Sequence, residues 1–325
     1  MTTGVKTAPM LLCGFLLSLP TVMANAQTYP DRPIKLVLPY APGGIVDTGG
    51  RLLGRALEAR LKQTVVADNR PGAGGVLGSG VVAQSAADGH TMLFIDPAIA
   101  INPSLQKSVP YDLFKDLKVV ATVSSSPLLV VVPQSLPVRN LKELVAYSKA
   151  QVAGVSFASA GVGTTTHLAP ELLKLQAGFV GTHVPYRGAG PSMPDVLTGR
   201  IQAVFYSPAA VQAYVSDNRV RAIAQTGSTR SPSNPTVPTG IESGFPDFRV
   251  DLWTAVFVPG ATPQPIVDRL AAEIKSVTED PTFRDAMAKI GADPFYQGPA
   301  EAAAFVRKDF DKWVELIRRA KIEVN

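Results

Sequence analysis

Residues 34–47 read Ile-Lys-Leu-Val-Leu-Pro-Tyr-Ala-Pro-Gly-Gly-Ile-Val-Asp, and the fold of the whole chain can be worked out from this stretch. Its first five residues are a short β-type run, and a helical pattern of apolar residues follows as far as Leu61. Residues 64–67 are again typical of a strand. Because parallel strands need a crossover such as this helix, the order strand, helix, strand predicts an α/β domain.

The same alternation continues along the rest of the chain. Apolar runs of strand length occur at residues 91–95, 119–123, 128–132, 155–158, 201–206, 220–224 and 252–258. Helical patterns occur near residues 76–87 and at 141–151, 263–278, 281–290 and 299–320. Asn140 and Glu143 form a capping-box pair at the start of the second of these helices.

This order of elements predicts two α/β lobes with mainly parallel sheets. A chain of 325 residues exceeds what one hydrophobic core usually serves. We expect residues 27–128 and 250–325 to form domain 1, and residues 129–249 to form domain 2 as an insertion. Crossings near residues 127–131 and 248–253 would make a two-strand hinge. A ligand cleft would then lie at the carboxyl ends of the strands.

Residues 1–26 have the three parts of a secretory signal peptide. Lys6 precedes the apolar run 10–19, and the small-x-small triplet Ala24-Asn25-Ala26 fits a signal peptidase. We expect cleavage after Ala26 and export of the remaining chain. The alternative is an uncleaved membrane anchor, but the apolar run is well short of the roughly 20 residues that a membrane span needs.

Composition excludes several classes of function. Cys13 is the only cysteine and lies within the apolar run, so the mature chain would have no disulfide, thiolate metal site or cysteine nucleophile. The net charge is +5, and the basic residues are scattered rather than gathered into a stripe, which argues against nucleic-acid binding. A mild positive balance is compatible with an acidic ligand without arguing for one.

The first candidate site is the loop that joins the strand at residues 34–38 to the following helix. Paired glycines before a helix expose main-chain N–H groups, and the helix dipole favours an anion there. A carboxylate can therefore be held without any charged side chain. The alternative is a tight turn that simply needs glycine. The candidate residues of this loop are Tyr40, Ala41, Pro42, Gly43, Gly44 and Asp47.

A second loop of the same kind follows the strand at residues 155–158. Its hydroxyl groups add hydrogen-bond donors to the free main-chain N–H groups, and two such loops in two lobes suggest a clamp. The alternative is an ordinary capped helix start, since Thr is a common N-cap. The candidate residues are Ser159, Gly161, Gly163, Thr164 and Thr165.

Other motifs do not support an enzyme. Residues 69–78 contain G-x-G-G-x-x-G, whose glycine spacing differs from the dinucleotide fingerprint, and Asp96 is not suitably placed for a ribose. His90, His167 and His183 match no metal motif. We therefore expect no catalytic residues, no metal and no cofactor. A secreted hydrolase that uses Ser159 or a Thr of the same loop with His167 as base remains an alternative, although no acidic orienting partner is identifiable.

With these residues in view, the chain from about Tyr29 to Ile322 resembles the tripartite tricarboxylate transporter substrate-binding family, also called the Bug family. The motifs that carry the resemblance are Tyr29-Pro-Asp-Arg-Pro-Ile34, Pro42-Gly-Gly44 with Asp47 and Arg51, Asn69-Arg-Pro-Gly-Ala-Gly-Gly75, Asp88-Gly-His-Thr91, Gly161-Val-Gly-Thr-Thr-Thr-His-Leu168, His183-Val-Pro-Tyr-Arg-Gly188 and Pro235-Thr-Val-Pro-Thr239 with Glu242 and Gly244.

The resemblance implies a two-lobed, type II periplasmic-binding-protein-like receptor of the Venus-flytrap kind. It would be a monomer in the periplasm that binds a small carboxylate and delivers it to the membrane permease subunits of a tripartite transporter. Main-chain N–H groups of the two loops and trapped water would hold the carboxylate, while Asp195 and Tyr206 would shape the specificity end. A ligand-sensing receptor of a two-component system is an alternative with the same fold and ligand.

The chain departs from the family pattern at three positions. Ile45 stands where the family often has a small or hydroxylated residue, so we expect a more apolar cleft there. His90 replaces the usual Tyr. Pro170 falls in a helix that usually lacks proline, and we expect that helix to begin late enough to keep Pro170 in its first turn.

Overall fold

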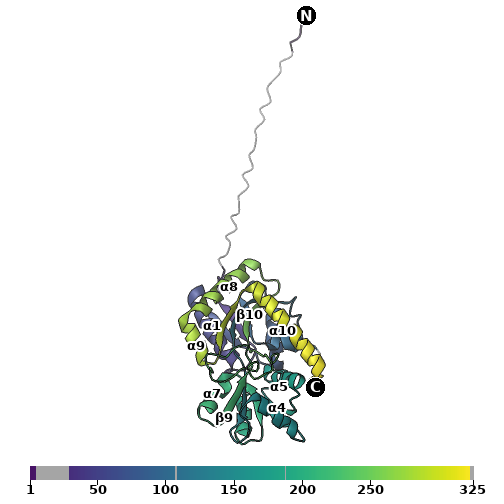
Figure 1. Ribbon diagram of the computed structural model, residues 1–325. Helices are drawn as coiled ribbons and strands as arrows, with labels where there is room; N and C mark the ends of the chain where they lie inside the picture. The colour runs from purple at the N-terminus through teal and green to yellow at the C-terminus, as the bar shows by residue number, and fades with distance from the viewer. Residues whose placement is uncertain (5–28, 107, 187, 323–325) are drawn as a thin grey trace.

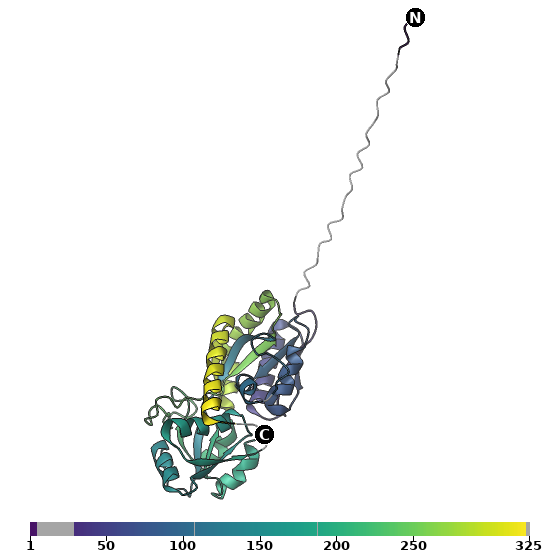
Figure 2. The same cartoon turned by 90° about the vertical axis from the view of Figure 1, so that its right-hand side faces the viewer.

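The computed structural model describes residues 1–4, 29–106, 108–186 and 188–322. From residue 29 on, the described chain folds into two lobes joined at a narrow waist (Figures 1 and 2). The expected signal peptide, with Cys13 and the cleavage point after Ala26, lies outside the described residues except for its first four. Among the described helices, none combines the length and apolar character that a bilayer crossing requires.

The first lobe is built around a six-stranded sheet in the order β11-β4-β10-β3-β1-β2. Its strands are β1 (Ile34–Leu38), β2 (Val65–Asn69), β3 (Thr91–Ile95), β4 (Leu117–Ser125), β10 (Thr254–Pro259) and β11 (Asp293–Gln297). Apolar side chains of α1 (Ile45–Leu61), α8 (Gln264–Glu279) and α9 (Pro281–Lys289) pack on one face. The other face is covered by α2 (Val76–Ala83), α3 (Ala98–Leu105) and α10 (Pro299–Ala320), and the short η1 (Ala73–Gly75) precedes α2.

The second lobe repeats this arrangement on a five-stranded sheet in the order β7-β6-β8-β5-β9. Its strands are β5 (Leu129–Pro133), β6 (Val155–Ser159), β7 (Gly181–Pro185), β8 (Ala203–Tyr206) and β9 (Val220–Gln225). Its helices are α4 (Leu141–Ala150), α5 (Thr165–Ala177), η2 (Gly190–Ser192), α6 (Met193–Leu197) and α7 (Pro208–Ser216). All five strands fall within residues 129–249.

Both sheets are mixed: most strands of each sheet run in one direction, as expected, and a minority run against them. In the first lobe β1 is parallel to β2 and β3, but β10 is antiparallel to β3 and β4. In the second lobe β6 is parallel to β7 and β8, but β5 is antiparallel to β8 and β9. The reason is the insertion itself. β5 and β10 each enter a lobe from the waist, and therefore run opposite to strands that end there.

The two crossings between the lobes lie side by side, as the sequence predicted. The N–H of Ser126 donates to the carbonyl of Leu252 at 3.1 Å, and the N–H of Leu252 donates back to Ser126 at 2.8 Å. The adjacent residues Pro127 and Asp251 form an antiparallel bridge. Two short, mutually paired segments therefore carry the chain from lobe to lobe.

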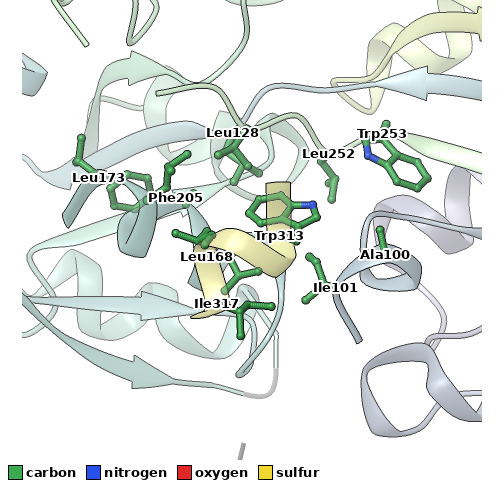
Figure 3. Packing of buried hydrophobic residues seen from close by; sticks show 14 of the residues in the cluster. Ala100, Ile101, Leu128, Leu168, Leu173, Phe205, Leu252, Trp253, Trp313 and Ile317 are labelled. Carbon is green, nitrogen blue, oxygen red and sulfur yellow. The ribbon is translucent and has the colours of Figure 1, made fainter. Parts of the chain in front are cut away.

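Helix α10 contributes to the packing of both lobes. It runs along the first lobe to the waist in both views (Figures 1 and 2), and near its end Trp313 and Ile317 pack in one cluster with Leu168 of α5 and Leu128 of the crossing (Figure 3). The indole N–H groups of Trp253 and Trp313 each donate to the same oxygen of Asp309, at 2.8 Å. One buried carboxylate thus ties α10 to the segment that returns from the second lobe.

Helix α5 begins earlier than its proline suggested. It starts at Thr165, so Pro170 is its sixth residue and lies in the second turn rather than the first. Proline at this position cannot donate a hydrogen bond back to the preceding turn. The expectation failed because the loop before the helix is fixed by its own hydrogen bonds, described below, and those bonds set where the helix begins.

Candidate ligand-binding cleft

A cavity of about 440 Å³ lies between the lobes, where loops after β1, β3, β6, β7 and β8 meet. This volume falls within the range of small-molecule sites. The residues that line it are Tyr40, Ala41, Pro42, Gly44, Ile45, Val46, Asp96, Ala98, Ala160, Thr164, Thr165, Thr166, Gly188, Ala189, Tyr206, Ser207, Ala210 and Leu252.

The loop before α1 presents main-chain N–H groups to this cavity. Gly43 has a φ of 101°, which favours glycine, and Gly44 is the N-cap of α1. The first intrahelical acceptor is Gly44, which receives the N–H of Thr48. The N–H groups of Ile45, Val46 and Asp47 therefore have no acceptor within the helix and are suited to an anion.

Asp47 supports this loop from behind instead of lining the cavity. Its Oδ2 accepts the N–H of Gly43 at 2.9 Å, and its Oδ1 accepts from the Asn69 amide at 2.9 Å and Arg51 Nε at 3.0 Å. Burial raises the pKa of Asp47, but the hydrogen bonds from Asn69, Gly43 and Arg51 outweigh burial and hold that pKa below its ordinary value. Asp47 is therefore a positioning residue.

The loop before α5 faces the first loop from the other lobe. Thr164 is the N-cap of α5, and its hydroxyl donates to the carbonyl of Gly161 at 2.7 Å. The hydroxyl of Thr166 accepts the N–H of Ala160 at 2.9 Å. These bonds fold the loop into a compact turn, so that the start of α5 opens into the cavity.

Two stacked histidines lie beneath this second loop. The rings of His167 and His183 are 3.8 Å apart between centroids and 13° from parallel. Nδ1 of His167 accepts the N–H of Gly163 at 3.2 Å, and Nε2 of His183 lies 2.6 Å from the hydroxyl of Ser159. Burial, His183 and Lys174 lower the pKa of His167 to about 3. Burial and Lys174 lower the pKa of His183 to about 4, so both rings are neutral at pH 7.

This geometry does not suit a hydrolase. Ser159 is 0% exposed and shares its hydroxyl with Gly161 as well as His183, so a substrate cannot reach it. His167, the expected base, bonds to Gly163 rather than to Ser159. Ser159 and both histidines therefore act as supports of the loop. Within the described part of the chain, no cluster of side chains is arranged to hold a metal ion.

The remaining wall comes from residues that the sequence did not mark as a site. Asp96 follows β3, and its Oδ1 accepts the Tyr40 hydroxyl at 2.7 Å and the N–H of Ala98 at 3.1 Å. Burial raises the pKa of Asp96, and burial together with Asp96 raises that of Tyr40 well above its ordinary value. The sequence did contain a signal for this part of the site: like the two glycine-containing loops, Asp96 and Pro97 connect a strand to a helix.

The predicted site residues divide into three groups in the structure. Seven line the cavity: Tyr40, Ala41, Pro42, Gly44, Thr164, Thr165 and Tyr206. Five lie in the two loops or at the adjoining ends of α1 and β6 without lining it: Gly43, Asp47, Ser159, Gly161 and Gly163. Asp195 is not among the lining residues, because its carboxylate accepts the Tyr186 hydroxyl at 2.6 Å and Arg200 Nη1 at 2.6 Å. Arg187 of the quoted motif lies outside the described residues.

Two lobes, two paired crossings and a cleft at the carboxyl ends of strands define a periplasmic-binding-protein fold of type II. Residues 50–322 match the family described as tripartite tricarboxylate transporter family receptor. The chain belongs to this family of solute receptors, and it is a receptor rather than an enzyme.

Individual relatives agree with this assignment. Protein BugT of Bordetella pertussis is 36% identical over 296 residues, which cover 90% of this chain and 91% of that protein. R. palustris Rpa4515 with adipate is 29% identical, covers 91% of this chain and 99% of its own, and has a TM-score of 0.83. MatC (Rpa3494) from Rhodopseudomonas palustris with bound malate is 29% identical and has a TM-score of 0.77. The match covers 89% of this chain and 100% of MatC.

Proposed function

We propose that this receptor captures a small carboxylate between its lobes in the periplasm and delivers it to the permease subunits of a tripartite transporter. One observation carries the proposal. The N-termini of α1 and α5 open into the same cavity from opposite lobes. Each end carries free N–H donors and about half a positive charge from the helix dipole. Two solved relatives, with adipate and with malate, support the same ligand class.

The two crossings supply the motion that such a receptor needs. A ligand that bridges both helix ends binds the closed arrangement better than an open one, and this difference in affinity shifts the population towards closure. Recognition of the closed form by the permease would then complete delivery. We propose that the protein acts as a monomer after cleavage at Ala26. A sensor for a two-component system would share the site, and co-purification of membrane partners separates the two.

The proposal is tested by a thermal-shift screen of residues 27–325, freed of bound ligand by unfolding and refolding. The ligands are mono- and dicarboxylates, acidic amino acids, aromatic acids and, as controls, the matching amides. A ligand at 100 times its Kd stabilises the folded state by about 2.7 kcal/mol. We expect a rise in Tm with one carboxylate class and none with its amide.

A matched pair of variants shows where the ligand binds. Ala210 of α7 lines the cavity, whereas its neighbour Ala209 is exposed and does not. Ala210→Leu should fill part of the cavity and abolish the ligand-dependent rise in Tm, while Ala209→Leu should retain it. No response to any carboxylate, or equal binding by both variants, would overturn the proposed site.

A further inference from the structure

We infer that this cleft selects a monocarboxylate with an apolar body, and that Asp96 is the residue that turns a second carboxylate away. The inference rests on the proposed function, because it places the one carboxylate of the ligand between the N-termini of α1 and α5. The observations that carry it are the position of Asp96, the hydrogen bonds of the polar groups in the cleft, and the apolar character of the rest of the wall.

Asp96 brings a carboxylate of the protein into a cavity that otherwise favours anions. It follows β3 directly and lines the cavity beside the loop of Tyr40. Its Oδ1 accepts the Tyr40 hydroxyl and the N–H of Ala98, the first residue of α3. The N-terminus of α3 is therefore already capped by an internal acid. A second carboxylate on the ligand would meet like charge there instead of a free helix end.

Three of the hydroxyl groups that line the cleft already have partners within the protein. The Tyr40 hydroxyl donates to Asp96, and the Thr164 hydroxyl donates to the carbonyl of Gly161. The Tyr206 hydroxyl lies 2.8 Å from that of Ser192, and burial raises the pKa of Tyr206 to about 12, so it keeps its proton. Among the described residues that line the cavity, none is a lysine, an arginine or a histidine. A second carboxylate would thus meet no cation among these described lining residues.

The rest of the wall is apolar. Ile45, Ala98, Ala160, Ala189, Ala210 and Leu252 all line the cavity. Tyr206 also lines the cavity, and its hydroxyl is bonded to Ser192. A carboxylate placed against such a surface without hydrogen bonds loses its hydration and gains nothing in return. An alkyl or aryl group gains free energy from the same contact.

The inference is tested with pairs of ligands that differ only in the second carboxylate. Isothermal titration at pH 8 compares hexanoate with adipate and benzoate with terephthalate on ligand-free protein; this pH is chosen because burial raises the pKa of Asp96. We expect the monocarboxylate of each pair to bind at least about tenfold more tightly. Asp96→Asn keeps the hydrogen-bond acceptor and removes the charge, so it should narrow the ratio of the two Kd values.

Each result decides a different question. Equal or tighter binding of the dicarboxylates would overturn the inference and leave the proposed function standing. An unchanged ratio in a folded Asp96→Asn protein would remove the role of Asp96. Tighter binding of leucine than of 4-methylpentanoate would mean that Asp96 accepts an ammonium group, which also overturns the inference. If no carboxylate binds, the proposed function fails as well.

Discussion

Oδ2 of Asp47 accepts the main-chain N–H of Gly43 across 2.9 Å, and this bond holds the loop that opens α1 towards the cleft. Its other oxygen binds Asn69 and Arg51, so the first turn of α1, the loop and β2 are tied together by one carboxylate that is only 5% exposed. The proposed binding surface of this loop is main chain, and Asp47 supports it without lining the cavity.

Asp47→Ala should therefore weaken ligand binding without removing any group that touches the ligand. The loss of three hydrogen bonds leaves the Gly43 N–H without a partner and the Asn69 amide with only the carbonyl of Tyr40 as acceptor, and should cost about 1–3 kcal/mol of unfolding free energy. Titration calorimetry and urea unfolding measure the two effects. Glu58→Ala, an exposed acid on the same helix, is the control and should change neither. Unaltered affinity in Asp47→Ala would show that the loop holds itself.

The stacked histidines predict a pH dependence of stability. The unfolded chain binds protons near pH 6.5, whereas the pKa values of His167 and His183 in the folded protein are about 3 and about 4. The unfolded state therefore binds more protons between pH 6.5 and about 4, and the unfolding free energy falls as pH falls through this window. The unfolding free energy changes by about 1.4 kcal/mol per pH unit for each histidine in this window. Above pH 7 the pair contributes no pH dependence.

His183→Asn tests this origin of the pH dependence. The variant should lose less unfolding free energy than the parent between pH 6.5 and 4.5, while the difference between the two proteins stays constant from pH 7.5 to 8.5. Urea unfolding at each pH gives the curves. If the two curves run parallel down to pH 4.5, protonation of His183 is not the cause.

Asp309 should be among the most sensitive positions for stability. Its carboxylate accepts both indole N–H groups, from Trp253 and Trp313, and pairs with Lys312 at 2.5 Å. Asp309→Ala leaves two buried donors unpaired and should cost about 3–5 kcal/mol. Asp311→Ala, two residues further along α10 and exposed, should cost almost nothing. A Tm of Asp309→Ala equal to that of the control would contradict the shared hydrogen bonds.

Gly163 and Leu105 give a test of the contact between the lobes. Gly163 has a φ of 77°, and a Cβ there would lie 2.1 Å from Cδ2 of Leu105 in the first lobe. Gly163→Ala should lower ligand affinity, and adding Leu105→Ala should restore part of it, since the clash is removed but the backbone strain remains. Gly178→Ala is the control: it adds a side chain at a residue whose φ is already 64°, at the end of α5, without a contact between the lobes. The ligand affinity of this variant should stay normal. Absence of any rescue would indicate strain alone.

The two lobes and the two loops that open into the cavity could be predicted from the sequence because their signals are local. A strand shows as a run such as residues 34–38, a helix as a spacing of apolar residues, and an anion-binding turn as the glycines 43 and 44 between them. Each of these features needs only neighbouring residues to be recognised.

Tertiary structure alone decided which residues line the cavity and which support the lining residues. Ser159 bonds to His183, 24 residues away, and Tyr40 bonds to Asp96, 56 residues away. Asp195 is drawn away by Tyr186 and Arg200. The direction of β5 and β10 was equally hidden, because it depends on where the waist lies and not on the strands themselves. Local patterns determine elements, whereas partners and directions depend on contacts between segments that only folding brings together.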